Sequence, residues 1–290
     1  MSDPSIALCG IVRNEIRSVI EWLAHYKALG FTDFIIYDNE STDGTGEVLQ
    51  ALDDAGELIR LDWPHSVGER PQRLAYEHMR KNSSVDWIAF FDADEFLLLR
   101  QDDTISDFLK RFDADVNAIA VNWIVFNSGG QKTYLAAPVM ERFTEALRPR
   151  AAVNRSVKPI GRRRKLSGTG VHRVSVAEGR YVMPSGEDAE FITLRATKSP
   201  EVEIAALHHY AVKSLEEFEE KRNRGHANSQ DPDKKRKKLD MRFDEVNAPG
   251  RPNTDMLAKS GRMRVEAMRL CAILQEAGLY YPVWPFVEDK

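Results

Sequence analysis

The stretch WIAFFDADEFL, residues 87–97, places three carboxylates directly after a short apolar run. The run Trp87–Phe91 has the length and composition of a strand that is buried on both faces of a sheet. Because side chains alternate along an extended chain, we expect Asp92 and Asp94 to point the same way. Burying two unpaired like charges is costly, and a divalent cation such as Mg²⁺ or Mn²⁺ would remove that cost.

A structural alternative explains the same carboxylates. An acidic turn can follow a core strand, with Asp94 or Glu95 capping the next helix. For an isolated Asp-x-Asp this alternative is the better one. With a buried strand in front of the motif, both interpretations stand, and other parts of the chain must decide between them.

Strand-like and helix-like segments alternate through the first half of the chain. The expected strands span residues 6–12, 34–37, 58–61 and 87–91, and the expected helices span 13–29, 46–52 and 71–81. Such alternation predicts crossover connections and a mainly parallel, Rossmann-like sheet flanked by helices. We therefore predict an α/β domain over residues 1–212, with a helical C-terminal extension over 213–290 packed on it.

The pattern changes after residue 105. The expected elements are a helix over 105–112, a strand over 118–126, strand-like pieces at 171–176 and 192–194, an exposed loop or frayed helix over 231–252 and a final helix over 255–277. Some apolar residues of that last helix are expected to pack on the core, namely Leu257, Val265, Met268, Leu270, Ile273 and Leu274.

Composition limits the class of protein. The 290 residues include 45 acidic and 41 basic side chains, and the formal charge of -4 gives no general case for nucleic-acid binding. The two cysteines, Cys9 and Cys271, form no disulfide framework and fit a reducing cytosol. No signal peptide and no apolar stretch of about 20 residues is visible, so we expect a soluble, cytoplasmic protein without a membrane span.

Polar clusters follow three of the expected strands. They are Arg13-Asn14-Glu15, Asp38-Asn39 and the acidic residues from Asp92 to Glu95. Ligands of open α/β sheets bind beyond the carboxyl ends of the strands, so parallel strands would bring these clusters to one rim. Asp38 could accept hydrogen bonds from a ribose or a base. Glu15 is either a ligand or a first-turn carboxylate near the helix dipole, and residues 41–43 fit helix capping.

Taken in order, these and later motifs resemble family 2-type glycosyltransferases with the GT-A fold, and most closely the family 92, or DUF23-like, subgroup. The N-terminal motifs are Arg-Asn-Glu at 13–15, Glu-Trp-Leu-x-x-Tyr at 21–26, Asp-Asn-x-Ser-x-Asp at 38–43 and Phe-Asp-x-Asp-Glu at 91–95. The later motifs are Trp-x-x-Phe-x-Ser-x-Gly at 123–130, Glu-Arg-Phe at 141–143, Val-Lys-Pro at 157–159, Gly-Val-His at 170–172 and His-Tyr-x-x-Lys-Ser-x-x-Glu-Phe-x-x-Lys at 209–221. The resemblance covers about residues 5–225 and departs at Arg13, where the family often has lysine.

The resemblance implies a role for each matching residue. Asp38 would contact the uracil or ribose of a nucleotide sugar. Asp92 would contact the ribose and support a divalent cation, Mn²⁺ or Mg²⁺, that Asp94 and His209 bind. Without the resemblance, the pair His208-His209 fits core packing as well as ligation. The remaining candidates for the nucleotide-sugar site are Arg13, Glu15, Asn39 and Lys158.

The acceptor hydroxyl needs a general base, which in inverting enzymes of this fold is commonly a carboxylate. Glu141 lies in the Glu-Arg-Phe motif, and Asp188 lies in a Gly-Glu-Asp segment similar to the Glu-Asp pair of other family 2 enzymes. We favour Glu141, although a surface carboxylate paired with Arg142 or Arg148 explains this residue equally well.

Two basic runs, residues 162–165 and 234–238, fit solvated surface. The second run could also touch anionic lipid head groups, which leaves peripheral membrane contact open.

The sequence therefore predicts a metal-dependent, inverting glycosyltransferase of the hexosyltransferase type. It would move a sugar from a nucleotide sugar, first of all a UDP-sugar, to a hydroxyl of a glycan or lipid-linked acceptor in polysaccharide biosynthesis. A nucleotidyltransferase of GT-A-like fold is an alternative, but it would usually carry a glycine-rich basic loop, and residues 6–20 hold a single glycine. The other alternative is a degenerate, non-catalytic member that binds a sugar or nucleotide.

Overall fold

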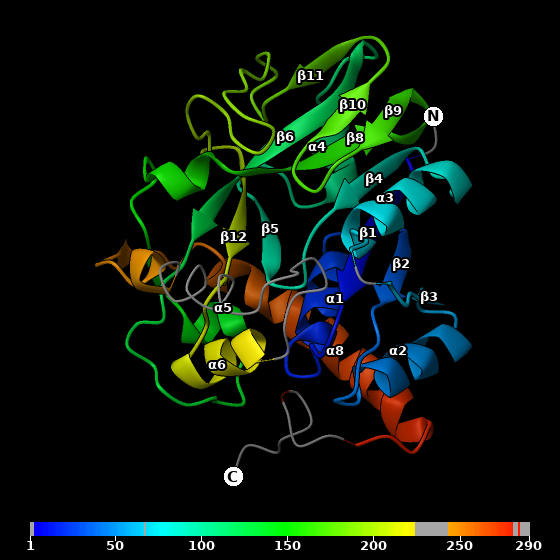
Figure 1. The fold of residues 1–290 in the computed structure, drawn as a ribbon, viewed down its shortest axis with the longest axis vertical. Helices are drawn as coiled ribbons and strands as arrows, with labels where there is room; N and C mark the ends of the chain where they lie inside the picture. The colour runs from blue at the N-terminus through cyan, green and yellow to red at the C-terminus, as the bar shows by residue number, and fades with distance from the viewer. Residues whose placement is uncertain (1–2, 67, 224–242, 281–283, 285–290) are drawn as a thin grey trace.

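The computed structural model describes residues 3–66, 68–223, 243–280 and 284 (Figure 1). Its largest sheet has the strand order β3-β2-β1-β4-β8-β6-β12-β5, with β11 beside β6. The strands of this sheet are β1 (Ile6–Val12), β2 (Asp33–Asp38), β3 (Ile59–Asp62), β4 (Trp87–Phe90), β5 (Glu95–Leu99), β6 (Val116–Val125), β8 (Val157–Arg162), β11 (Arg180–Val182) and β12 (Ala205–His209). Two small ribbons pair β9 (Leu166–Thr169) with β10 (Val174–Val176) and β7 (Glu145–Ala146) with β13 (Arg251–Pro252).

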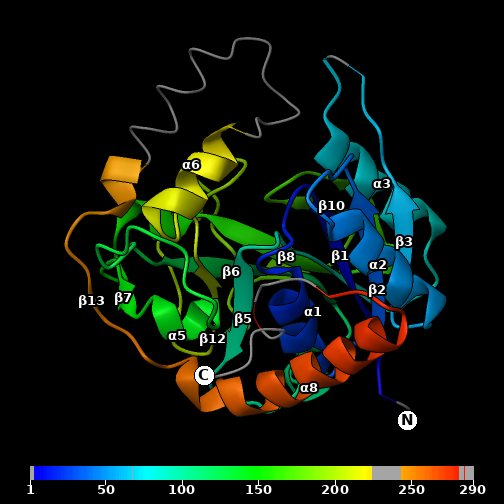
Figure 2. The ribbon, with the colours of Figure 1, turned by 90° about the horizontal axis from the view of Figure 1, so that it is seen from below.

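Helices cover both faces of the sheet (Figure 2). They are α1 (Val19–Ala28), α2 (Thr45–Asp54), α3 (Pro71–Asn82), α4 (Ile105–Lys110), α5 (Val139–Arg142), α6 (Leu215–Asn223) and α8 (Leu257–Glu276). In β4, Trp87 and Ala89 join the apolar cluster of α1 and α8, whereas Ile88 and Phe90 join the cluster of α3. This alternation confirms that the run before the acidic motif is buried on both faces.

The N-terminal half of the sheet is parallel. Strand β1 pairs in parallel with both β2 and β4, and β2 pairs in parallel with β3. Val12 at the end of β1 lies opposite Asp38 at the end of β2. The carboxyl ends of β1, β2 and β4 therefore meet at one edge, and the predicted α/β class with a mainly parallel sheet is confirmed.

The other half of the sheet contains strands that the sequence pattern did not indicate. Strand β8 runs antiparallel between β4 and β6, and its Pro159 and Gly161 are residues that usually weaken a strand. Strand β12 is parallel to β6 and antiparallel to β5. The β5–β12 pairing sets His209 opposite Glu95, so the late histidine lies beside the acidic motif.

Two predicted segments differ from the structure in their exposure. Residues 192–194 form an exposed bend in place of a strand, and Leu194 is 81% exposed. In α8, Leu257, Val265 and Met268 are exposed, so the prediction that they pack on the core is wrong. The buried positions of that helix are Met263, Ala267, Leu270, Cys271 and Leu274.

Two further predictions concern the basic run near the C-terminus and the absence of a membrane-spanning helix. The basic run 234–238, and residues 231–242 of the predicted loop, lie outside the described residues. Among the helices that are described, none has the length and apolar character needed to cross a bilayer.

Gly10 in β1 lets helix α1 pack closely on the sheet. A methyl group added at Gly10 would lie 2.4 Å from the Cη2 atom of the buried Trp22. We expect Gly10→Ala to destabilise the protein by about 1–3 kcal/mol, because the core would have to shift. Gly261→Ala is the matched control, since nothing lies within 4 Å of its added methyl and a helix favours alanine. Urea unfolding measures both variants, and equal stability of Gly10→Ala and the wild type would contradict the packing argument.

Candidate functional site

A turn separates the two aspartates of the acidic motif. Strand β4 ends at Phe90, a turn follows at residues 93–94, and the backbone N–H of Glu95 donates to the carbonyl oxygen of Asp92 at 3.0 Å. The carboxylates of Asp92 and Asp94 therefore meet different partners. The predicted extended chain through the motif is wrong, so the alternation of side chains along a strand does not apply to these two aspartates.

Asp92 binds a buried lysine from the neighbouring strand. The ammonium of Lys158 in β8 is fully buried and donates to Oδ1 of Asp92 at 2.7 Å, with Oε2 of Glu95 at 3.8 Å. Gln72 also donates to Oδ1 of Asp92, at 2.6 Å, and Tyr76 donates at 3.2 Å. Burial alone would raise the pKa of Asp92, but Lys158 outweighs burial and holds this pKa below its usual value.

Glu95 and Lys158 complete this group. Glu95 is fully buried, and burial raises its pKa well above the usual range. Burial alone would lower the pKa of Lys158, but the carboxylates of Asp92 and Glu95 outweigh it, so the net pKa is raised. The group therefore holds a Lys158–Asp92 pair in which each partner favours the charged form of the other, beside a buried carboxyl whose pKa is raised.

Asp94 lies between a histidine and a second lysine. Its Oδ1 is 3.5 Å from Nε2 of His209, and its Oδ2 accepts from Nζ of Lys221 at 2.5 Å. Burial alone would raise the pKa of Asp94, but Lys221 and His209 outweigh it and hold this pKa well below its usual range. Asp94 therefore favours the ionised carboxylate although the residue is buried, with only 8% of its surface exposed.

The donor atoms of Asp94 and His209 suit a divalent cation. Carboxylate oxygen and imidazole nitrogen are ligands that Mn²⁺ accepts, and His209 lies beside Asp94, which lines a cavity. The third predicted ligand, Asp92, is turned toward Lys158 and Gln72. Within the described ranges, no set of three histidine, cysteine or acidic side chains is arranged to hold a metal.

A cavity of about 350 Å³ opens beside Asp94, between the β1–α1 connection and helix α6. Its charged lining side chains include five acidic and three basic groups, namely Glu15, Asp43, Asp94, Glu217 and Glu220 with Arg17, Lys213 and Lys221. The excess of acidic groups favours a cation, and the basic groups can bind the oxygens of an anionic ligand.

Local backbone structure fixes the walls of this cavity. Asn14 and Lys213 both have positive φ values, 54° and 53°, which are unusual for residues other than glycine. Ser214 and Glu217 form a capping box at the start of α6, because the N–H of Glu217 donates to Oγ of Ser214 and the N–H of Ser214 donates to Oε2 of Glu217. This start sets Lys221, on the second turn of the helix, against Asp94.

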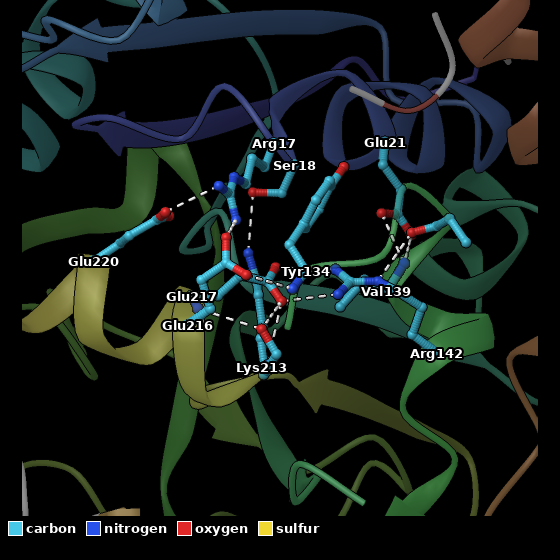
Figure 3. A network of polar contacts seen from close by, with 12 residues as sticks. Arg17, Ser18, Glu21, Tyr134, Val139, Arg142, Lys213, Glu216, Glu217 and Glu220 are labelled. Atoms are coloured by element: carbon cyan, nitrogen blue, oxygen red, sulfur yellow. Dashed lines mark hydrogen bonds and ion pairs between the residues drawn. The ribbon is translucent and has the colours of Figure 1, made fainter. Parts of the chain in front are cut away.

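The wall from α6 is tied to α1 by a buried polar network (Figure 3). The guanidinium of Arg142 donates to both carboxylate oxygens of Glu217, at 2.8 and 3.0 Å. Burial alone would raise the pKa of Glu217, but Arg142 outweighs it and lowers this pKa to about 2. On the other side, Glu21 of α1 accepts from the N–H of Val139 with both oxygens, at 2.8 and 2.9 Å.

The predicted nucleoside end of the site lies at the ends of β1 and β2. Asp38 is buried, and its Oδ2 accepts from Arg60 at 2.8 Å while its Oδ1 accepts from the N–H of Ser41. Asn39 is buried and donates to the carbonyl oxygen of Trp63. Arg13 follows β1 directly and is half-buried at this edge.

The predicted opening of α1 at residue 13 is wrong. Helix α1 begins at Val19, and residues 13–18 form turns. Side chains of the next loop hold this turn, because the N–H of Glu15 donates to Thr45 and the N–H of Ile16 donates to Asp43. Glu15 itself faces the cavity, with Oε2 3.9 Å from the ammonium of Lys213.

Both candidates for the base lie away from the cavity lining. Arg264 of α8 donates to both carboxylate oxygens of Glu141, at 2.9 and 2.6 Å. Asp188 is 74% exposed at its side chain and pairs with Arg180 at 2.7 Å. Neither carboxylate is among the residues that line the 350 Å³ cavity. The arginine partner of Glu141 is thus Arg264 from a distant segment.

The structure adds residues to the site that were not among the candidates. Lys213 and Lys221 stand in the long motif that begins at His209, and their spacing in the motif is the signal that could have identified them. The rings of His172 and Trp123 pack edge to face, and burial together with the nearby ammonium of Lys158 lowers the pKa of His172 to about 4.

Glu21 should make the stability of the protein depend on pH. Burial raises its pKa from 4.5 to about 7. Between these values the unfolded chain releases the proton and the folded protein keeps it, so the free energy of unfolding falls as the pH rises. Glu21→Gln removes this loss, and its stability relative to the wild type should rise by up to about 3 kcal/mol from pH 5 to pH 8. Urea unfolding at both pH values tests this, and a difference independent of pH would refute it.

Comparison with known proteins agrees with the resemblance seen in the sequence. The family model described as glycosyltransferase family 92 matches residues 6–246. A family 92 protein of Oryza sativa is 32% identical over 111 residues, which are 37% of this chain and 18% of that protein. A family 92 protein of Ricinus communis is 27% identical over 221 residues, which are 74% of this chain and 37% of that protein. The chain therefore spans little more than a third of the length of these relatives, or less.

One of the similar solved structures is matched over nearly the whole chain. The mannosyltransferase PcManGT from Pyrobaculum calidifontis, solved with GDP-Man and Mn²⁺, is 13% identical with a TM-score of 0.43, over 96% of this chain and 76% of that one. The GT-A fold class expected from the sequence is confirmed by the mixed sheet flanked by helices together with the family match. The chain belongs to glycosyltransferase family 92.

Proposed function

We propose that the protein is a glycosyltransferase that takes a sugar from a nucleotide sugar bound at the rim formed by β1, β2 and β4. The observation that carries this proposal is the cavity beside Asp94, where the β1–α1 connection meets the residues that follow β12. Membership of family 92 supports the reaction class. A UDP-sugar is the donor to be tested first.

The residues of the proposed site form two groups, one for the nucleoside and one for the diphosphate of the donor. Arg13, Asp38 and Asn39 lie at the ends of β1 and β2, where a nucleoside would bind, with Glu15 closer to the cavity. Lys213, Lys221 and Arg17 line the cavity and offer the charged donors that a diphosphate needs. Asp92 follows β4 at the same rim, where Lys158 favours its ionised form and holds it in place.

Asp94 and His209, with Asp92 nearby, would hold a divalent cation, Mn²⁺ or Mg²⁺. When bound, such a cation acts as a Lewis acid that stabilises the negative charge of a departing diphosphate. The excess of acidic side chains in the cavity supports this proposal, because a diphosphate alone would be repelled there. Lys213 and Arg17 would orient the phosphate oxygens during the transfer.

Transfer with inversion needs one carboxylate that accepts the proton of the acceptor hydroxyl as the new glycosidic bond forms. Glu141 and Asp188 stay the predicted bases, with a glycan or a lipid-linked sugar as the acceptor. Their pairing with Arg264 and Arg180 means that either one would have to leave its arginine to act.

The cation site can be tested through Asp94. Asp94→Asn keeps the shape of the side chain but removes the charge that binds the cation. We expect Mn²⁺-dependent hydrolysis of the cognate UDP-sugar to fall about a hundredfold or more, because the Lewis acid supplies several kcal/mol. A thermal-shift screen of nucleotide sugars with and without Mn²⁺ identifies the donor first. Glu190→Gln, an exposed carboxylate paired with Lys198, is the control. An unchanged rate in Asp94→Asn would refute the metal assignment.

The base can be tested through Glu141. Because Arg264 holds this carboxylate outside the cavity, we expect Glu141→Gln to lower the free energy of unfolding by about 1 kcal/mol or less, as partly exposed ion pairs do. As the predicted base, Glu141 accepts the acceptor proton, so Glu141→Gln should lower turnover by at least about a hundredfold while UDP affinity stays unchanged. Turnover within about threefold of the wild type would instead move the assignment to Asp188.

A further inference from the structure

Asp94 binds a lysine through one carboxylate oxygen and faces a histidine with the other. Nζ of Lys221 lies 2.5 Å from Oδ2 of Asp94, and Nε2 of His209 lies 3.5 Å from Oδ1. A Mg²⁺ or Mn²⁺ ion between Oδ1 and His209 would bind the carboxylate oxygen at about 2.0–2.2 Å. The cation and the ammonium would then share one carboxylate, and the repulsion between their positive charges would weaken the hold of Lys221 on Asp94.

The two lysines of the site differ in their freedom to move. Lys158 is fully buried between Asp92 and Glu95, with no solvent-facing side. The side chain of Lys221 is 28% exposed, and within the part of the chain that the structure describes it also donates to the carbonyl oxygen of Ala211, at 3.1 Å. A lysine ammonium is carried on a flexible four-carbon chain, so the ammonium of Lys221 can leave Asp94 while α6 stays in place.

The ammonium of Lys221 would remain in the cavity after it left Asp94. Lys221, Asp94 and Lys213 all line the same 350 Å³ space. Arg17 and Lys213 are held by other groups, since Arg17 pairs with Glu216 and Glu220 and Lys213 binds Ser18. A diphosphate in this cavity would therefore meet a lysine that the metal had just released.

We propose that Lys221 is an exchangeable counter-ion of Asp94. It neutralises the carboxylate in the cation-free protein, a divalent cation displaces it, and the displaced ammonium then binds the donor diphosphate. This inference rests on the proposed function for the role of the diphosphate, but the exchange between lysine and cation stands on the Asp94 geometry alone. Lys221 and the cation thus compete for Asp94, whereas cation and donor bind together.

Calorimetric titration of the full chain with MnCl₂, without nucleotide, tests the competition. We expect Lys221→Met to bind Mn²⁺ roughly tenfold more tightly than the wild type, because the competing ammonium is gone. With saturating Mn²⁺, the same variant should bind UDP several-fold more weakly. Lys213→Met is the matched control, since it removes one cavity charge of the same kind that does not touch Asp94.

Each result decides the proposal. Tighter Mn²⁺ binding in Lys221→Met than in Lys213→Met supports it. Equal Mn²⁺ affinities in the two variants would mean that only the total charge of the cavity matters, which would overturn the proposal. Absence of Mn²⁺ binding in all of the proteins would overturn it as well. Lys221→Arg keeps a cation at this position and should bind Mn²⁺ no more tightly than the wild type, which separates lost charge from altered folding. Absence of sugar transfer with the competition intact would refute the proposed function alone.

Discussion

The buried ammonium of Lys158 is the constraint on which the site depends. A lysine that is fully buried must be paired, since the cost of leaving its charge without a partner is several kcal/mol. Asp92, which follows β4, and Glu95, the first residue of β5, supply the partners. The pairing therefore ties β8 to the connection between β4 and β5. The same connection carries Asp94, which lines the cavity.

The site contains two lysine–aspartate pairs that differ in how deeply the lysine is buried. In the inner pair, the buried ammonium of Lys158 stays bound to Asp92, so this pair stabilises the fold around the site. The outer pair, Lys221 with Asp94, lies at the cavity and is partly exposed. The capping box at Ser214 and the bidentate pair of Arg142 with Glu217 keep the backbone of α6 fixed. Chemistry at the outer pair can thus change without moving the helix that carries it.

The sequence predicted the parts of the fold that follow a simple period. The alternation of strands and helices up to residue 97 and the buried run before Asp92 correspond to β1 to β4 and their helices. Strand β8 was not predictable, because Pro159 and Gly161 give it no strand composition, and its place depends on Lys158 meeting carboxylates 66 residues away. The arginine partner of Glu141 could not be predicted for the same reason, since Arg264 is 123 residues away in the sequence. Local spacing carries no information on such contacts.

The cavity has a consequence for the order in which ligands can bind. Its lining has more acidic than basic side chains, so a diphosphate entering alone gains little from Lys213 and Arg17 while facing Asp94 and Glu15. A cation at Asp94 would reverse that balance, both by its own charge and by releasing the ammonium of Lys221 into the same space. The positive charge offered to the donor would then be larger than the charge of the cation alone. Under the proposed exchange, binding of cation and donor would be coupled, because both ligands favour the state in which Lys221 has left Asp94.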